Sequence, residues 1–442
     1  MSTYKITGPT KLSGSASVQG AKNSSMKLVN LPILANDKFT FRNIPNISSN
    51  KNLAKLTALQ GATVNWLDEN TVEIDSTKII KPIRIPSDLF YHTSGAIYIR
   101  NMLIARFGEC EIEIILERDD TGGDQIGRTF NLETDRKIMN EFNVDVELKG
   151  NIMVYKERDK APLDIDAKNS FGFTLGGIFF LLGKDGISKI QNPSHMAELY
   201  DVIEALNKMG AEIKIEDKKL ITVVEGKELH GVDFTCMYDK HNFITLLSAA
   251  LCTESEITIE NIDFEKMKLG SLDLFLKQSG VKIEFNDKDK TAFIPSQKLS
   301  DLKTVDLIAS DLPDFVTEWQ VLLSPLFSLI KGQSNIVEGY FTNRMRHWEE
   351  MKKFGANYEF YTHPDFDEDS DNNPRAVKVN RVEKLKAAIA TSRDVKCGAM
   401  LLIAGMVAEG ESVINDPEDH IKRGYENLAG VLNILGAKIQ AL

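Results

Sequence analysis

The stretch ALNKMGAEIKI, residues 205–215, shows the pattern that decides the fold. An amphipathic helical pattern runs up to Gly210, and apolar and polar residues then alternate as they do in a strand. Glycine and asparagine are the residues that most readily end a helix in the left-handed conformation. The stretch therefore predicts a helix, a stop at Gly210 and a strand.

This pattern of helix, stop residue and strand occurs six times along the chain. The stop residues are 67 to 82 residues apart, so each unit is too long for a usual solenoid repeat and has room for two helices and about four strands. Strands that alternate with helices are typical of layered α/β units. The sequence therefore predicts an α/β fold of two domains, each with three repeated βαβαββ-like units. The stop residues are Gly61, Asn143, Gly210, Gly280, Gly355 and Gly436.

The composition is that of a globular protein with an acidic balance. The 442 residues carry a net charge of −11 and no basic tract, which argues against a nucleic-acid-binding surface. The longest apolar stretch, FTLGGIFFLLG, is too short to span a bilayer, and the opening residues lack the apolar region of a signal peptide. The four cysteines form no CxxC pair, which indicates free thiols and no zinc site. We therefore expect a cytoplasmic protein that binds neither nucleic acid nor membrane.

Eight further motifs follow one another along the chain: VQGAKNSS, ARFG, GGDQIGR, NSFGFT, VTEWQ, FTNRM, SRDVKCGAMLLIAG and HIKRGYENL. In this order and spacing, and together with the six repeats, they resemble the enolpyruvyl transferases. Within that family the resemblance is closest to the UDP-N-acetylglucosamine 1-carboxyvinyltransferases of peptidoglycan synthesis. The branch that acts on shikimate phosphate is disfavoured, because its GDKS start and its Gly-Asn-Ala-Gly-Thr loop are both missing.

The resemblance implies an inside-out α/β barrel in each of two domains, with the active-site cleft between them. One domain would span residues 22–237 and carry the Gly-Gly-Asp loop, and the other would combine residues 1–21 and 238–442. The implied reaction transfers the enolpyruvyl group of phosphoenolpyruvate to a hydroxyl group of UDP-N-acetylglucosamine and releases phosphate. It needs no cofactor and no metal, and we expect a monomer.

This chemistry needs cations for a phosphate and a carboxylate, an acid that protonates C3 and a base near the acceptor hydroxyl. By the resemblance, Lys22 holds phosphoenolpyruvate, and Arg423 clamps the carboxylate with its two-pronged guanidinium. Asp124 stands where the family usually has the loop cysteine, and a carboxyl group can deliver the C3 proton in its place. Without the thiolate, we expect the enzyme to be insensitive to the epoxide antibiotic fosfomycin. Glu318 occupies the position of the aspartate base, one bond further from the backbone.

Other motif positions are implied to bind the nucleotide end of the acceptor. Arg128 matches the arginine after the glycine loop, although the spacing is one residue short and Thr129 is the alternative. Ser170 stands in a motif that suits a diphosphate, because backbone amides beside a glycine, together with a lysine, favour anions. Its simpler interpretation is a helix cap. Arg128 is implied to bind substrate, and the residues expected at the nucleotide end are Asn131, Leu132, Lys168, Ser170 and Gly172.

The chain departs from the family pattern toward the sugar end of the acceptor. Tyr340 falls where a small aliphatic residue usually faces the acetyl group, and Ser94 replaces an arginine. Elsewhere in the site, Lys396 replaces another arginine, which keeps the charge but loses the planar fork. Asn23 is implied to contact the sugar, and Thr317, Arg344 and Asp394 match further motif positions that are implied to bind substrate.

These departures leave three hypotheses about function. The first is enolpyruvyl transfer to UDP-N-acetylglucosamine. The second is the same chemistry on another nucleotide, such as UMP in a nucleoside-antibiotic pathway. The third is a degenerate homologue that binds a nucleotide sugar without turnover, against which the retention of Lys22, Asp124, Glu318 and Arg423 argues.

Overall fold

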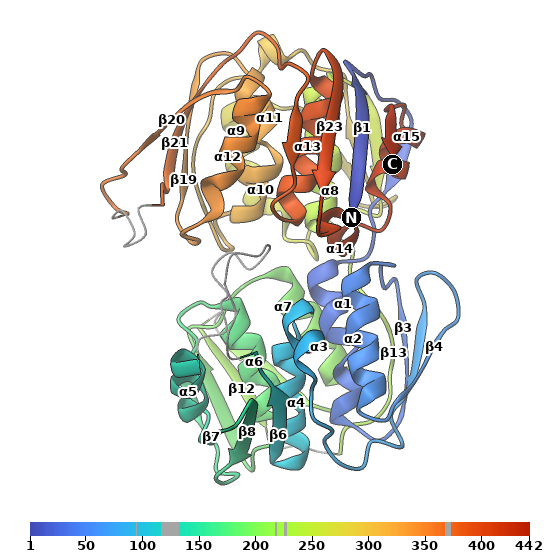
Figure 1. The fold of residues 1–442 in the computed structure, drawn as a ribbon, viewed down its shortest axis with the longest axis vertical. Helices are drawn as coiled ribbons and strands as arrows, with labels where there is room; N and C mark the ends of the chain where they lie inside the picture. The colour runs from blue at the N-terminus through green and yellow to red at the C-terminus, as the bar shows by residue number, and fades with distance from the viewer. Residues whose placement is uncertain (94, 116–131, 217–218, 225–227, 367–372) are drawn as a thin grey trace. The chain divides into compact units, whose positions relative to one another are not determined.

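The computed structural model describes residues 1–93, 95–115, 132–216, 219–224, 228–366 and 373–442. The chain divides into two compact units. The C-terminal unit comprises Met1–Gln19 and Tyr238–Leu442, and the N-terminal unit comprises the described residues between Gly20 and Met237. Both have a mixed α/β fold (Figure 1).

The N-terminal unit contains three sheets, with strand orders β13-β3-β5-β4, β11-β12-β10-β9 and β6-β8-β7. In the two four-stranded sheets, an antiparallel hairpin lies beside a parallel pair of strands. The strands are β3 (Lys38–Arg42), β4 (Thr63–Trp66), β5 (Val72–Asp75), β6 (Glu109–Glu113), β7 (Val144–Lys149), β8 (Ile152–Glu157), β9 (Asp164–Asp166), β10 (Ile187–Gln191), β11 (Glu212–Glu216), β12 (Leu220–Val224) and β13 (Asp233–Thr235).

In this unit, α4 packs against α6, and α1 packs against both α2 and α7. Buried apolar residues of α4 and α6 supply much of the core, each contributing roughly 1.5–3 kcal/mol when fully buried. The helices are α1 (Lys22–Leu28), α2 (Ser48–Leu59), α3 (Ser87–His92), α4 (Ala96–Phe107), α5 (Leu132–Glu141), α6 (Phe171–Leu181) and α7 (Ala197–Lys208), with a 3₁₀ turn η1 (Leu31–Leu34).

The C-terminal unit also has three sheets, with strand orders β22-β23-β1-β24, β15-β16-β14-β2 and β18-β17-β19-β21-β20. Each again joins an antiparallel hairpin or ribbon to a parallel pair. The strands are β1 (Ser2–Gly8), β2 (Ser15–Ser17), β14 (Ile257–Glu260), β15 (Glu284–Asn286), β16 (Thr291–Ile294), β17 (Asp306–Ser310), β18 (Phe315–Val316), β19 (Gln333–Glu338), β20 (Asn357–Tyr361), β21 (Ala376–Asn380), β22 (Ile389–Thr391), β23 (Gly410–Asp416) and β24 (Ile439–Ala441).

Four helices, α8, α10, α11 and α13, contact one another in the core of the C-terminal unit (Figure 1). Every residue of α8 is buried, which explains its lack of a polar face. The helices are α8 (Lys240–Cys252), α9 (Asp273–Ser279), α10 (Thr317–Leu322), α11 (Ser324–Leu329), α12 (His347–Lys353), α13 (Val395–Val407), α14 (His420–Gly424) and α15 (Leu428–Ile434), with 3₁₀ turns η2 (Leu269–Leu272), η3 (Leu299–Asp301) and η4 (Arg344–Arg346).

The predicted helix stops are confirmed. All six stop residues have positive φ, from 61° at Asn143 to 115° at Gly436. At Gly280, for example, the backbone amide donates to the carbonyl of Leu276 and closes the last turn of α9. Most side chains with a Cβ are strained in this conformation, and asparagine tolerates it better than the others, so these positions favour glycine or asparagine.

Candidate active site

Glu318 lies at the start of α10, next to the predicted residue Arg344. Arg344 Nη2 is 3.9 Å from Glu318 Oε1, and the two side chains are 10% and 19% exposed. The Arg344 guanidinium also lies 4.5 Å from the centre of the Phe341 ring, in a cation–π contact. The carboxylate predicted to act as the base therefore has a cationic neighbour that is held by an aromatic ring.

Thr317, the residue before Glu318, is bound to a buried carboxylate. Its Oγ1 donates to Glu338 Oε2 at 2.5 Å, and Gln320 Nε2 donates to the same oxygen at 3.3 Å. The backbone amides of Tyr340 and Phe341 donate to Glu338 Oε1 at 3.0 and 2.9 Å. Burial raises the pKa of Glu338, while Arg344 and these hydrogen bonds act in the opposite direction. Sequence reasoning missed Glu338, because its role depends on the approach of α10 to the end of β19.

Lys396 is held over Tyr425. Its Nζ lies 5.1 Å from the centre of the Tyr425 ring, and the Tyr425 hydroxyl shares a hydrogen bond of 2.8 Å with Thr245. Burial alone would lower the pKa of Lys396, but Tyr425, Asp239 and Glu318 outweigh it and raise the pKa. The surroundings of Lys396 therefore favour its charged form.

Asp394 caps helix α13. Its Oδ1 accepts hydrogen bonds from the backbone amides of Lys396 and Cys397, both at 2.8 Å. A carboxylate at this place satisfies amides that the helix leaves unpaired and interacts favourably with the helix dipole. Its observed contacts thus orient the first turn of α13, which carries Lys396.

Arg423 lies on the short helix α14 and is partly buried. Its Nη1 is 3.5 Å from His420 Nδ1. The buried carboxylate of Asp416 accepts from the backbone amides of His420 and Ile421 at 2.8 and 3.0 Å, and so fixes the start of α14. The guanidinium is presented by a short, firmly anchored helix.

Tyr340 is 37% exposed and makes an edge-to-face contact with Phe341, with 4.6 Å between the ring centres. The turn that carries both residues is held by Glu338, as described above. Tyr340 therefore presents an aromatic surface on a fixed backbone.

In the N-terminal unit, Lys22 and Asn23 are the first two residues of α1, and both are partly exposed. A Cβ atom on the nearby Gly20 would lie 1.9 Å from the carbonyl oxygen of Asn43, so only glycine fits there. Ser24 Oγ donates to Asp201 Oδ2, which also accepts from the backbone amide of Met237. These contacts fix the helix start that carries Lys22 and Asn23.

The KNSFG motif forms the turn into α6. Lys168 is exposed and has a φ of 49°, and its amide donates to Asp166 at 2.9 Å. The Ser170 hydroxyl accepts from the backbone amide of Phe173 at 3.3 Å, so Ser170 caps α6 as its simpler interpretation predicts. A Cβ atom on Gly172 would reach only the Tyr98 hydroxyl, at 3.6 Å.

Leu132 is the first residue of α5, whose position is set by a buried ion pair. Asp135 of this helix accepts from Arg100 Nη1 at 2.5 Å and from the Tyr155 hydroxyl at 2.8 Å. The predicted residues Asp124, Arg128 and Asn131 lie outside the described residues, as do Thr129, the alternative to Arg128, and Ser94, which replaces an arginine.

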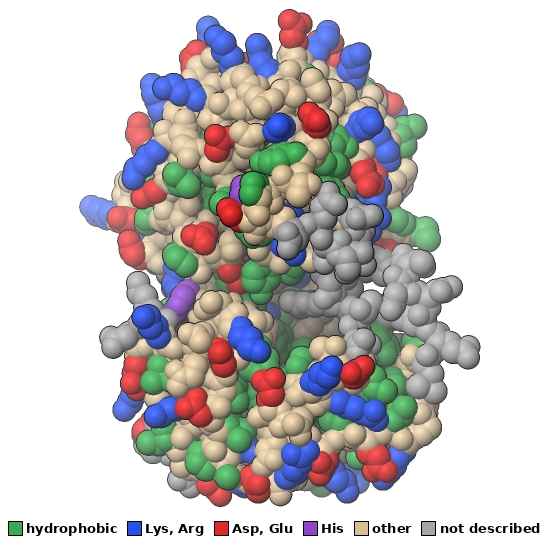
Figure 2. Space-filling view, turned by 90° about the vertical axis from the view of Figure 1, so that its left-hand side faces the viewer, with side chains coloured by type: hydrophobic (Ala, Val, Ile, Leu, Met, Phe, Trp, Pro, Cys, Tyr) green, Lys and Arg blue, Asp and Glu red, His purple; other side chains and the backbone are tan. Residues whose placement is uncertain are grey.

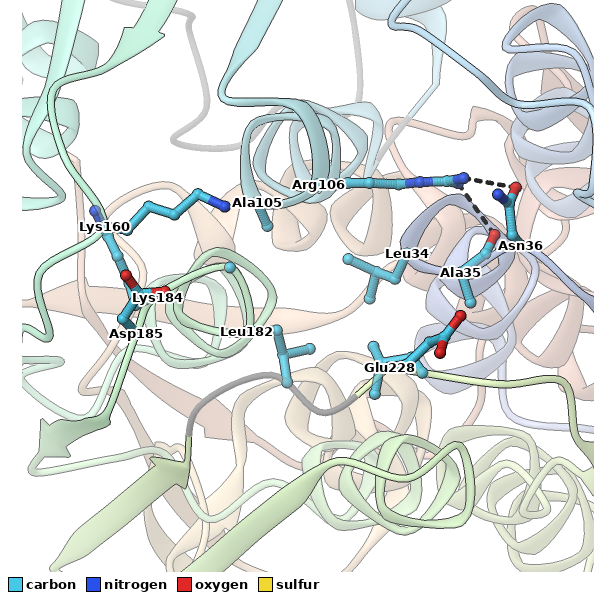
Figure 3. Close-up of a pocket in the computed structure, with 12 residues that line it drawn as sticks. Leu34, Ala35, Asn36, Ala105, Arg106, Lys160, Leu182, Lys184, Asp185 and Glu228 are labelled. Atoms are coloured by element: carbon cyan, nitrogen blue, oxygen red, sulfur yellow. Dashed lines mark hydrogen bonds between the residues drawn. The ribbon is translucent and has the colours of Figure 1, made fainter.

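A cavity of about 340 Å³ in the N-terminal unit is lined by none of the predicted site residues (Figure 3). Arg106 of the ARFG motif lies at its edge and donates to the carbonyl oxygens of Ile33, Ala35 and Ile79 and to Asn36. Since these acceptors already occupy its guanidinium, the role of Arg106 is structural. Its hydrogen bonds hold the backbone at Ile33 and Ala35 next to the backbone at Ile79.

Acidic and basic side chains are interspersed over the face drawn in Figure 2. The four cysteines are free, as predicted, and all are buried, which raises the pKa of Cys110 and Cys252 to about 12. Within the described part of the chain, no His, Cys, Asp and Glu side chains cluster as a metal site would require. In the same part, no helix has the length and apolarity to cross a membrane.

Comparison with known proteins identifies relatives of the entire chain. The profile of the EPSP synthase (3-phosphoshikimate 1-carboxyvinyltransferase) family matches residues 6–432. UDP-N-acetylglucosamine 1-carboxyvinyltransferase 1 of Clostridium acetobutylicum is 29% identical over 445 residues, covering 100% of this chain and 99% of its own. The UDP-N-acetylglucosamine 1-carboxyvinyltransferase of Campylobacter hominis is 30% identical over 444 residues, with the same coverage.

Two solved structures share the fold. The enolpyruvyl transferase NikO from Streptomyces tendae superposes with a TM-score of 0.84 at 19% identity, covering 100% of this chain and 99% of its own. EPSP synthase from Acinetobacter baumannii has a TM-score of 0.71 at 12% identity, with full coverage of both chains. At these identities the two structures support the fold alone.

Proposed function

Since this chain belongs to the EPSP synthase family of enolpyruvyl transferases, which use phosphoenolpyruvate, we propose that its acceptor is a hydroxyl group of UDP-N-acetylglucosamine. The full-length similarity to relatives named for that acceptor supports this choice. The observation that carries the chemistry is the Glu318 carboxylate beside Arg344 at the start of α10. The reaction would supply a precursor of peptidoglycan.

Glu318 is the proposed base. It takes the proton of the acceptor hydroxyl as that oxygen attacks C2 of phosphoenolpyruvate. Asp124 is the proposed acid, which protonates C3 in the same addition. Loss of a C3 proton and of phosphate from the adduct then restores the double bond, so that the acceptor carries the enolpyruvyl ether.

Three cations are proposed to hold phosphoenolpyruvate: Lys22, Arg423 and Lys396. The phosphate and the carboxylate of the substrate carry its negative charge, and charge-assisted hydrogen bonds to such groups are strong. Lys396 suits this role, because its contacts raise its pKa and keep it charged. Asp394 would act by orienting the helix turn that presents Lys396.

The start of α6 is the proposed diphosphate site. The Ser170 hydroxyl uses its oxygen to accept from Phe173, which leaves its hydrogen to donate to a phosphate oxygen. The amino end of this 11-residue helix favours an anion, and Lys168 adds a positive charge. Leu132, with Asn131 and Arg128, would contact the uridine end, and Asn23 the sugar.

One observation favours a second acceptor. Tyr340 is exposed, and its ring is fixed against Phe341, so it fills space that a small aliphatic residue would leave for the acetyl group. This favours a nucleotide without the acetylated sugar, such as UMP. We further propose that the three sheets and the buried helices of each unit form an inside-out α/β barrel, since five of the six sheets of the described residues combine an antiparallel hairpin or ribbon with a parallel pair.

Phosphate release tests both acceptors directly. The enzyme would be mixed with phosphoenolpyruvate and, in separate reactions, UDP-N-acetylglucosamine, UDP-glucose, UDP or UMP. Release that depends on UDP-N-acetylglucosamine supports the first proposal, and release only with UMP supports the second. If none of the four acceptors supports phosphate release, both proposals are contradicted.

A further inference from the structure

Glu338 is the point at which two segments of the C-terminal unit meet. It is the last residue of β19, and its side chain is 0% exposed. One carboxylate oxygen accepts from Thr317 and Gln320 of α10, and the other accepts from the backbone amides of Tyr340 and Phe341. One buried carboxyl group thus binds the helix that begins with the Thr317–Glu318 pair and also the turn that carries Tyr340.

The same two segments meet at a second contact. Arg344, which follows the turn, packs over Phe341 and pairs with Glu318. The contacts therefore form a closed ring from Glu338 through Thr317 and Glu318 to Arg344, and back through Phe341 to Glu338. A ring of this kind fixes the distance between the Glu318 carboxylate and the Tyr340 side chain, because neither segment can shift without breaking a buried hydrogen bond.

We propose that Glu338 is a positioning residue for the acceptor: it fixes the Tyr340 turn and the start of α10 in one geometry, so that the acceptor hydroxyl lies within reach of Glu318. This inference rests on the proposed function of Glu318. Glu338 itself does not touch the substrate, since it is fully buried and four donors occupy its two oxygens.

The surroundings of Glu338 provide a test that separates positioning from chemistry. In Glu338→Gln, the amide oxygen can still accept from Tyr340 and Phe341. The new NH₂ group can donate to Thr317 Oγ1, and also to Gln320 after its amide turns, because Gln320 Oε1 has no hydrogen-bond partner among the described residues. The glutamine variant therefore keeps the ring without the charge, whereas Glu338→Ala breaks it.

The experiment compares these two variants with Ser334→Ala, a control on the same strand. Ser334 is also fully buried and accepts a backbone amide, that of Val305, at 3.1 Å. We expect Glu338→Gln to keep kcat and acceptor KM within about threefold of wild type. Glu338→Ala should lose on the order of 100-fold in kcat/KM for the acceptor, the cost typical of a displacement of about 1 Å, while KM for phosphoenolpyruvate changes far less. Ser334→Ala should lower Tm without this change in the acceptor parameters.

Hydrogen exchange of the Tyr340 and Phe341 amides gives a readout that does not depend on turnover. Both amides should be protected in wild type, Glu338→Gln and Ser334→Ala, and should exchange faster in Glu338→Ala. If Glu338→Ala does not fold, Thr317→Val breaks the ring at a different bond, and it should lower kcat while both amides stay protected.

Two results would overturn the inference. Loss of activity in Glu338→Gln as severe as in Glu338→Ala, with the amides still protected, would show that the charge itself is required. Unchanged acceptor kinetics in Glu338→Ala would show that the ring does not position the acceptor. A wild-type enzyme that releases no phosphate with any acceptor would instead contradict the proposed function, and acceptor binding measured by calorimetry on the same variants would then decide whether Glu338 shapes the acceptor site.

Discussion

Arg344 Nη2 lies 3.9 Å from Glu318 Oε1, and the Phe341 ring holds the guanidinium in that place. The carboxylate that would accept the acceptor proton thus has a cation at ion-pair distance. The candidate base therefore consists of Glu318 and a cation that lies 26 positions further along the sequence.

Glu318→Gln tests this base directly. The amide keeps the shape of the side chain but cannot accept the proton, so turnover should fall by about 100-fold or more, in line with general-base catalysis. Nucleotide binding, measured by calorimetry, should change only a few-fold. Glu318→Asp, which shortens the reach by one bond, should retain more turnover than Glu318→Gln. Unchanged turnover in Glu318→Gln would show that another group takes the proton of the acceptor hydroxyl.

Lys22→Ala and Arg423→Ala test the cations. Each should lower kcat/KM for phosphoenolpyruvate by about 100-fold or more while circular dichroism stays unchanged, because the removed charges would stabilise developing negative charge. Lys422→Ala is the matched control, since Lys422 is the exposed neighbour of Arg423. Near wild-type activity in either test variant would remove that residue from the site.

Because His347 is buried, we expect the free energy of unfolding to fall in mild acid. Burial lowers its pKa from 6.5 to about 4, so between these values the unfolded chain binds more protons than the folded chain. Stability should therefore fall as the pH drops from 6.5 toward 4, by on the order of 3 kcal/mol from this group. Urea unfolding at pH 5 and pH 7 measures this, and the difference should shrink in His347→Gln. An equal pH dependence in the variant would refute the assignment.

With Asp124 at the loop position, we expect the enzyme to be insensitive to fosfomycin. A carboxylate is a far poorer nucleophile toward an epoxide than a thiolate, so the wild type should not be alkylated, and Asp124→Cys should become sensitive. Activity should survive that change, because either side chain can pass a proton, whereas Asp124→Asn should be much slower. Mass spectrometry after exposure to the drug and a phosphate-release assay give the two readouts. Covalent modification of Asp124, or full activity of Asp124→Asn, would leave the loop as an ordinary turn.

Local chemistry explains what could be predicted about the fold. A helix end such as the one at Gly210 or Gly436 needs only a residue that tolerates positive φ, and this requirement is visible in a few neighbouring letters. The free cysteines followed from their spacing in the same way.

Long-range contacts explain what could not be predicted. Glu338 lies 21 residues from its partner Thr317, and Tyr425 lies 180 residues from Thr245. Such pairs depend on how helices and strands pack, and local sequence patterns do not show this packing. Ser170 shows a further limit, because its capping hydroxyl fits both the simpler interpretation and the proposed diphosphate site.

Glu318 and its neighbours are proposed to transfer an enolpyruvyl group to the hydroxyl of UDP-N-acetylglucosamine. The most direct measurement is a competition in which the enzyme receives phosphoenolpyruvate with equal UDP-N-acetylglucosamine and UMP, and the products are identified by mass spectrometry. We expect the enolpyruvyl ether of UDP-N-acetylglucosamine as the main product, formed together with one phosphate per ether, and we expect this product to be lost in Glu318→Gln. An enolpyruvyl ether of UMP alone, or phosphate without any ether, would contradict it.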